Sequence, residues 1–212
     1  MSYYPIFADL TGRRCVVVGG GKVAERKVAR LLRCGARVTV ISPTVTRRLA
    51  RDAQEGQIRR LSRPFRVADL TGAWLVYAAT DDQRVNGRVS RSAAQRRIFT
   101  NVVDQTPLCS FIAPAILQRG TLTIAISTGG ASPSLAKHLR RDLERTIGEG
   151  YLPMLRLLTS LRGVAQQRLP SFAARRRYFG QLLAGRVFEL VKAGKPVEAR
   201  REAERLLNSG HA

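Results

Sequence analysis

The chain has 212 residues, of which 44% are hydrophobic and 25% are charged, so it can bury a core and is too apolar for general disorder. Its 37 lysines and arginines against 15 acidic residues leave a formal charge of +22, which favours an acidic partner, although arginines on solvated faces account for it equally well. The three cysteines are far apart, no window approaches the roughly 18 apolar residues of a membrane span, and the N-terminus lacks a signal-peptide pattern, so we expect a cytoplasmic protein without disulfides, membrane contact or a bound metal.

Strands alternate with helices through the first hundred residues. A strand is predicted at 14–18, a helix at 23–34 after a glycine turn, and a strand at 37–41, which completes one βαβ unit. The elements expected next are a polar helix at 44–56, a weak strand at 58–61, a buried strand at 74–79, a helix at 85–97 and a strand at 98–103. Strands that are apolar on both faces indicate a parallel sheet with helices on both sides.

The pattern changes after residue 104. A loop at 105–109 and an apolar segment at 111–117 precede a strand at 122–127, a glycine turn and a helix at 132–147. From 152 onward the pattern is helical, with breaks near Pro170 and Pro196; residues 148–150 are a candidate hinge, and 209–212 are expected to fray. We therefore predict three parts, at 1–112, 113–149 and 150–212: an α/β domain, a small α+β segment and a helical domain.

A glycine-rich turn follows the first strand. Residues Gly19 to Ala24 match G-x-G-x-x-G/A, with Ala24 in the last place. In a dinucleotide-binding Rossmann domain, Gly19 would permit the tight turn, Gly21 would let the backbone approach a pyrophosphate, and free N–H groups at the helix start would face the phosphates. Because the match lies within a predicted βαβ unit, we favour dinucleotide binding over a simple glycine turn.

The end of the second strand does not decide between NAD and NADP. It is followed by Ser42, Pro43 and Thr44 rather than by the acidic residue typical of NAD sites. Ser42 or Thr44 could bind the adenosine ribose, and Arg47 or Arg48 could hold a 2′-phosphate.

Two further strands end in polar residues, at the edge where open α/β sheets bind ligands. Thr80, Asp81 and Asp82 follow one of them, and Asp104 follows the other. Helix N-capping is the stronger explanation for Asp81 and Asp82. Asp104 precedes a loop, so capping explains it less well and it is the better site candidate.

Another candidate anion site joins the strand at 122–127 to the following helix. Ser132 is the expected N-cap and Pro133 the first helical residue, which is equally consistent with a well-capped helix and nothing more. The helix carries a basic face, suited to carboxylates or to solvent: Lys137, His138, Arg140, Arg141 and Arg145. Neither His138 nor His211 is a convincing metal ligand, and a surface or packed histidine is the leading interpretation.

With these segments assembled, the chain resembles the precorrin-2 dehydrogenase/sirohydrochlorin ferrochelatase family, the dehydrogenase portion of siroheme synthases. The resemblance rests on residues 5–7, 18–27, 78–82, 101–104, 110–114 and 127–133, in order over about 145 residues. It implies NAD-dependent oxidation of precorrin-2 to sirohydrochlorin. Some members also insert Fe²⁺ to give siroheme, and whether this chain does so stays open.

The resemblance also implies roles for particular residues. Asp104 is expected to be the catalytic acid/base, and the family's lack of an acid after the second strand favours NAD. The expected cofactor contacts are Gly19, Gly21, Lys22, Val23, Pro43, Thr44, Thr80 and Asp81. The expected substrate contacts are Thr128, Ser132, Lys137 and His138. No metal ligands are expected, because the macrocycle itself holds the iron.

The family further implies a homodimer, with the segment at 113–149 exchanging contacts across the two-fold axis. Precorrin-2 carries eight carboxylates, so the substrate accounts for part of the positive charge. The tail from residue 150 onward is the least similar portion. No methyltransferase domain follows it, so we do not expect this chain to make precorrin-2.

Two other functions remain open at this point. An NAD(H)-sensing nucleic-acid-binding regulator would use the arginine-rich tail on phosphates, but that tail lacks a clear recognition helix, which makes nucleic acid a weak expectation. A dehydrogenase of small acids usually supplies a histidine or lysine acid/base, and the first half has no histidine.

Overall fold

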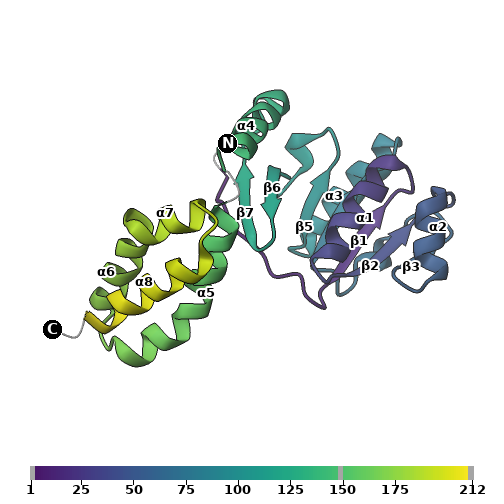
Figure 1. Ribbon diagram of the computed structural model, residues 1–212. Coiled ribbons are helices and arrows are strands. Elements are labelled where there is room, and N and C mark those ends of the chain that lie inside the picture. The colour runs from purple at the N-terminus through teal and green to yellow at the C-terminus, as the bar shows by residue number, and fades with distance from the viewer. Residues whose placement is uncertain (1–2, 148–149, 210–212) are drawn as a thin grey trace. The chain divides into compact units, whose positions relative to one another are not determined.

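The computed structural model describes residues 3–147 and 150–209, and it divides into two compact units, Met1–Ala113 and Pro114–Ala212 (Figure 1). Residues 1–2, positions 148 and 149 of the candidate hinge, and the tail residues 210–212 with His211 lie outside the described residues. Each unit is described separately below.

A five-stranded parallel sheet forms the centre of the first unit. Its strand order is β3-β2-β1-β4-β5, so the direction of winding reverses between β1 and β4. The strands are β1 (Arg14–Val18), β2 (Arg37–Ile41), β3 (Arg59–Leu61), β4 (Leu75–Ala78) and β5 (Phe99–Val102). The predicted strands are confirmed, three of them one residue or more shorter than expected.

Helices cover both faces of this sheet, as predicted. The first core packs Val17 and Val40 against α1 (Lys22–Arg33) and α2 (Arg47–Gln54). The second core packs Val16 and Val18 against α3 (Gln83–Gln95). Because successive strand residues point to opposite faces, α1 and α2 lie on one side and α3 on the other (Figure 1).

Local capping residues set where two of these helices begin. The polar helix predicted from residue 44 starts only at Arg47, since the Thr46 side chain accepts the N–H of Leu49 at 3.3 Å. Helix α3 starts two residues earlier than expected, because the Asp82 carboxylate accepts the N–H groups of Arg84 at 2.8 Å and Val85 at 3.2 Å. The capping explanation for Asp82 is therefore confirmed.

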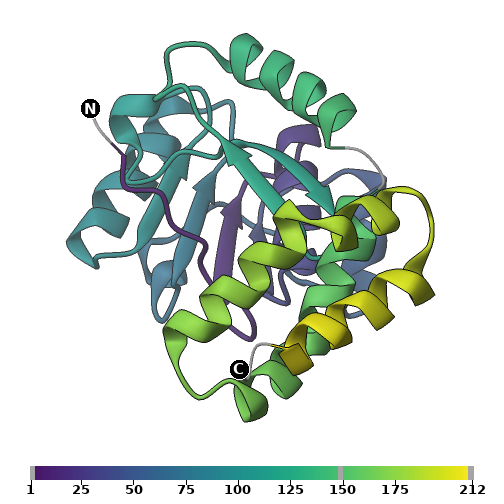
Figure 2. The ribbon, with the colours of Figure 1, turned by 60° about the vertical axis from the view of Figure 1, so that its left-hand side comes forward.

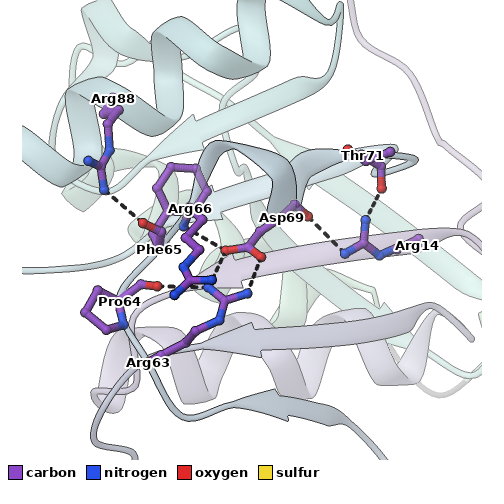
Figure 3. Close-up of polar contacts among 8 residues, drawn as sticks. All are labelled: Arg14, Arg63, Pro64, Phe65, Arg66, Asp69, Thr71 and Arg88. Carbon is purple, nitrogen blue, oxygen red and sulfur yellow. Dashed lines mark hydrogen bonds and ion pairs between the residues drawn. The ribbon is translucent and has the colours of Figure 1, made fainter.

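The connection from β3 to β4 is held by one buried carboxylate (Figure 3). Asp69, in the short 3₁₀ helix η1 (Val67–Leu70), accepts two hydrogen bonds from the Arg63 guanidinium at 2.6 and 2.9 Å. Its Oδ2 also accepts the N–H of Arg66 at 2.8 Å. Arg14 at the start of β1 donates to the carbonyls of Asp69 and Thr71, which ties this connection to the sheet. The hydrogen bonds hold the pKa of the Asp69 carboxyl below its usual value.

A β-hairpin and a helix open the second unit. The strands β6 (Ala115–Arg119) and β7 (Leu122–Ile126) pair antiparallel, and α4 (Pro133–Thr146) packs on β6. The apolar segment predicted at 111–117 thus contains the start of a strand, which sequence patterning left unassigned. Gly120 turns the hairpin with a φ of 55°, a conformation that favours glycine.

Four helices complete the second unit, and Figure 2 shows them as green to yellow coils packed on one another. They are α5 (Tyr151–Arg168), α6 (Phe172–Ala184), α7 (Arg186–Lys192) and α8 (Pro196–Ser209). The predicted breaks near Pro170 and Pro196 are confirmed, and Gly185 adds a third between α6 and α7. Leu161, Leu182 and Leu207 are fully buried in their shared core. Within the described residues, no helix is long and apolar enough to cross a membrane.

Candidate functional site

The glycine turn between β1 and α1 is closely enclosed on two sides. A Cβ atom on Gly19, whose φ is 121°, would lie 2.2 Å from the carbonyl oxygen of Ala79. A Cβ on Gly20 would lie 1.9 Å from the carbonyl oxygen of Thr44. The turn therefore fits between the end of β4 and the loop after β2 only without side chains. The expected need for glycine at 19 is confirmed, whereas Gly20, the variable position of the motif, was missed.

Gly21 differs from Gly19 and Gly20 because there is free space where its side chain would be. A Cβ there would meet nothing within 4 Å, and its backbone is extended, so neither sterics nor conformation inside the chain requires glycine. Gly21 is also the N-cap of α1 and supplies no capping side chain. The first N–H groups of α1 and the positive end of its dipole are thus suited to an anion beside Gly21.

The first turn of α1 also carries charged side chains. Glu25 accepts a hydrogen bond from the Thr46 hydroxyl at 2.5 Å and lies 3.7 Å from the exposed Lys22 ammonium. The hydrogen bond from Thr46, followed by the positive charge of Lys22, holds the pKa of Glu25 below its usual value. This carboxylate therefore links α1 to the loop after β2, where Pro43 and Thr44 are exposed.

Thr80 is held in place at the end of β4. Its hydroxyl donates to Asn86 Oδ1 at 2.8 Å, and Asn86 Nδ2 donates back to the Thr80 carbonyl at 2.9 Å. Asn86 is buried in α3 and was not predicted, since nothing in the sequence marks it as the partner of Thr80. Asp81 is exposed, and the cap of α3 is made by Asp82 instead.

Asp104 occupies an unusual backbone conformation just after β5. Its φ is 59°, in the left-handed region that a residue other than glycine enters at a cost. The side chain is exposed. The carboxylate therefore stands on a sharp turn at the carboxyl edge of the sheet, where ligands bind in folds of this class.

A short segment after η2 (Thr106–Leu108) clamps this turn. The Cys109 sulfur accepts the N–H of Val102 at 3.1 Å and lies 3.2 Å from the Val102 carbonyl and 3.3 Å from the Gln105 carbonyl. These contacts fix the backbone on both sides of Asp104. Burial raises the pKa of the Cys109 thiol, so it remains a neutral donor near pH 7.

Lys27 brings a positive charge to the same region. Its ammonium lies 4.7 Å from the centre of the Tyr77 ring in β4. Burial, and then two arginines of the same helix, hold the pKa of the Lys27 amine below its usual value, while the Asp104 carboxylate acts in the opposite direction. Sequence analysis missed Lys27, although its helical spacing from Ala24 and Leu31 places it toward the sheet.

The candidate substrate residues lie in the second unit. The Thr128 hydroxyl accepts the N–H of Ser132 and donates to its carbonyl, both at 3.0 Å, while Ser132 caps α4 by accepting the N–H of Leu135 at 3.1 Å. The expected N-cap is confirmed. Lys137 and His138 line a surface hollow of about 470 Å³ together with Ser134, Leu135 and Arg141. His138 is exposed, and its Nε2 lies 3.2 Å from an oxygen of Asp142.

The structure thus gathers the expected residues into two sets, each within its own unit. The first set surrounds the carboxyl ends of β1, β2, β4 and β5, and the second surrounds the start of α4. No cluster of three or more histidine, cysteine or acidic residues suited to a metal ion occurs in the described part of the chain.

Comparison with known proteins finds three family models that match successive parts of this chain. Residues 6–115 match a family model described as putative NAD(P)-binding, residues 119–146 match sirohaem biosynthesis protein central, and residues 150–207 match the sirohaem synthase dimerisation region. Siroheme synthase of Sodalis glossinidius (strain morsitans) is 41% identical over 210 residues, which are 99% of this chain and 45% of that protein. Siroheme synthase 1 of Serratia proteamaculans (strain 568) is 42% identical over 204 residues, 96% of this chain and 43% of that protein.

The chain therefore spans less than half the length of these curated relatives. A solved structure titled SirC, precorrin-2 dehydrogenase, has a TM-score of 0.79 and 29% identity, and the match covers 96% of this chain and all of that one. The likeness to that structure extends through both units.

Proposed function

This chain belongs to the sirohaem biosynthesis family built from a putative NAD(P)-binding region, a central region and a dimerisation region, and on that premise we propose that it oxidises precorrin-2 to sirohydrochlorin with NAD⁺. One observation carries the proposal. A glycine turn open only at Gly21 and an exposed Asp104 lie at the carboxyl edge of one sheet, in a chain that resembles a precorrin-2 dehydrogenase over 96% of its length. The same resemblance favours an enzyme over a nucleic-acid-binding regulator.

The residues of the first unit fit a dinucleotide. The pyrophosphate would be held by the backbone N–H groups that follow Gly21, at Lys22 and Val23, because no described residue lies within 4 Å of a Cβ at Gly21. Pro43 and Thr44 are exposed beside the turn and would contact the adenosine ribose. Thr80 and Asp81 would lie along the nicotinamide half, and Gly19 allows the turn to close. When bound, NAD⁺ accepts a hydride from the substrate.

Asp104 is the proposed general base. Oxidation of precorrin-2 by two electrons releases a hydride and a proton, and the exposed carboxylate can take the proton. The left-handed turn and the Cys109 contacts fix its position. The chain's own residues therefore orient a base at the sheet edge.

The second unit offers positive charge for the carboxylates of the tetrapyrrole. We assign substrate contact to Lys137 and His138 at the surface hollow, and to Thr128 and Ser132 at the start of α4. We propose that two copies of the chain assemble. The family's dimerisation region corresponds to residues 150–207, and the segment at 113–149 is proposed to exchange further contacts across the two-fold axis.

The test is direct mixing of the protein with precorrin-2 and NAD⁺. NADH absorbance and the spectrum of sirohydrochlorin should appear together, at a rate proportional to protein concentration. Asp104→Asn is the informative variant, since asparagine tolerates the left-handed backbone but cannot accept the proton. Glu55→Gln, which removes an exposed acid at the end of α2, is the matched control. Sirohydrochlorin without NADH, or an Asp104→Asn rate equal to that of Glu55→Gln, would contradict the proposal.

An experiment with ferrous iron tests whether the chain has ferrochelatase activity in addition to the proposed dehydrogenase activity. Anaerobic addition of Fe²⁺ to sirohydrochlorin, with and without the protein, measures whether the chain accelerates siroheme formation. Acceleration that Asp104→Asn abolishes would assign both steps to one carboxylate.

A further inference from the structure

Arg60 brings a guanidinium group to the end of β2. It lies in β3 opposite Val40, and its Nη2 donates to the carbonyl oxygen of Pro43 at 3.0 Å and to the Ser62 hydroxyl at 3.2 Å. Pro43 directly precedes Thr44, whose carbonyl oxygen abuts Gly20 in the glycine turn. The guanidinium therefore lies beside the loop that follows β2, which in Rossmann domains contacts the adenosine ribose.

The two segments that adjoin Arg60 in the sheet are rich in arginine. Residues 42–51, after β2, include three arginines and no acidic residue, and residues 57–66, around β3, include four arginines and no acidic residue. Arg63 is committed to Asp69 by two hydrogen bonds. By contrast, Arg60 forms no ion pair with any carboxylate in the described part of the chain.

Arg60 does not use all of its N–H donors in hydrogen bonds to the described residues. Both of its bonds come from Nη2, and its Nε is enclosed without a hydrogen-bond partner among the described residues. A guanidinium presents five N–H donors. Because Nε is enclosed and Nη2 is already bonded twice, the two N–H groups of Nη1 remain for an anion with many acceptor oxygens. A phosphate group meets that requirement, whereas a ribose hydroxyl does not need a cation.

We propose that the dinucleotide site accepts NADP⁺ as well as NAD⁺, with Arg60 donating to the 2′-phosphate of NADP⁺. The inference rests on the dinucleotide site of the proposed function but not on the oxidation of precorrin-2. It follows from the pairing of two features: residues 42–46, directly after β2, include no acid to repel a 2′-phosphate, and a guanidinium without a carboxylate partner lies beside them.

Binding of four nucleotides to the full chain tests this inference by calorimetry. NAD⁺ and NADP⁺ form one pair, and 5′-AMP and adenosine 2′,5′-bisphosphate form the other, so that each pair differs only by the 2′-phosphate. Arg60→Met keeps much of the side-chain volume and removes the charge. Arg59→Met is the matched control, since Arg59 is exposed and is the preceding residue of β3, which points to the opposite face of the sheet.

We expect the wild type to bind NADP⁺ about as tightly as NAD⁺. Arg60→Met should weaken the two 2′-phosphorylated ligands by about tenfold or more, with NAD⁺ and 5′-AMP unchanged. Arg59→Met should leave all four unchanged. Arg60→Lys should be intermediate, because lysine keeps the charge without the planar fork.

Three results would overturn the inference: wild type that binds NAD⁺ but not NADP⁺, an Arg60→Met variant that binds NADP⁺ normally, or an equal loss in Arg59→Met. In each case NAD⁺-dependent oxidation of precorrin-2 would remain intact. Conversely, nucleotide binding that follows the expected pattern without any oxidation of precorrin-2 would refute the proposed function alone.

Discussion

A single methyl group at residue 20 should disable the glycine turn. The added Cβ of Gly20→Ala would lie 1.9 Å from the Thr44 carbonyl oxygen and 2.9 Å from the Ser42 hydroxyl oxygen. Real Cβ atoms essentially never come closer than 3.0 Å, so the loop after β2 must move by at least about 1.1 Å. That loop is tied down by the N–H of Thr46, which donates to the Gly20 carbonyl at 3.0 Å. We expect a loss of about 1–3 kcal/mol in the free energy of unfolding, together with weaker NAD⁺ binding.

Gly21→Ala is the matched comparison, because the same methyl group there meets nothing within 4 Å on extended backbone. Its free energy of unfolding should stay within about 0.5 kcal/mol of the wild type. Its affinity for NAD⁺ should nevertheless fall by about tenfold or more, since the methyl would stand where we place the pyrophosphate. The two variants thus separate the internal fit of the turn from its fit to a ligand.

Trp74 makes the stability measurement specific to the first unit. It is the only tryptophan of the chain, and its ring lies 5.2 Å from that of Phe99 beside β4 and β5. Urea unfolding followed by its fluorescence therefore reports on the sheet, while calorimetry measures NAD⁺ binding. A Gly20→Ala variant as stable as the wild type would refute the steric reasoning. Unchanged NAD⁺ affinity in Gly21→Ala would refute the placement of the pyrophosphate.

Two further predictions concern side chains that hold the first unit together. Asp69→Asn should cost about 2 kcal/mol of unfolding free energy at neutral pH, measured through Trp74, because its amide nitrogen would face the donors of Arg63. The Arg63 hydrogen bonds are the main reason that the pKa of Asp69 is lowered in the folded state. The contribution of Asp69 to the free energy of unfolding is therefore complete above its unfolded pKa of about 3.8, and it is lost as the pH falls through its folded pKa. A difference in stability between the wild type and Asp69→Asn that did not shrink in acid would contradict this. Cys109→Ala should lower kcat for precorrin-2 more than it raises KM. Cys109→Ser should recover most of the rate, because its hydroxyl can still donate and accept hydrogen bonds. Equal losses in both variants would show that these hydrogen bonds do not position Asp104.

Local sequence signals predicted the sheet because its strands carry strong ones. Arg14–Val18 and Leu75–Ala78 are short apolar runs buried on both faces, and the glycines between β1 and α1 mark a turn of known geometry. The position of Asp104 at a strand end followed from the same alternation of strands and helices. These features depend on neighbours in the sequence, which patterning can detect.

The partners of those residues could not be predicted, because they depend on contacts between distant segments. Gly20 is required by Thr44, Thr80 is held by Asn86, and the backbone around Asp104 is fixed by Cys109. The strand β6 was missed since only Leu117 in it is fully buried, so its pattern is weak. The helical spacing of Lys27 indicates that it faces the sheet, but only the fold shows that its ammonium lies over Tyr77.

The amounts and rates of NADH and sirohydrochlorin formation from precorrin-2, measured in the wild type and in Asp104→Asn, test the central claim most directly. The account predicts one NADH for each sirohydrochlorin in the wild type, and a fall in rate of about 100-fold or more in the variant, with NAD⁺ affinity and Trp74 unfolding unchanged. Equal rates in the two proteins would contradict it, as would sirohydrochlorin formation that consumes no NAD⁺.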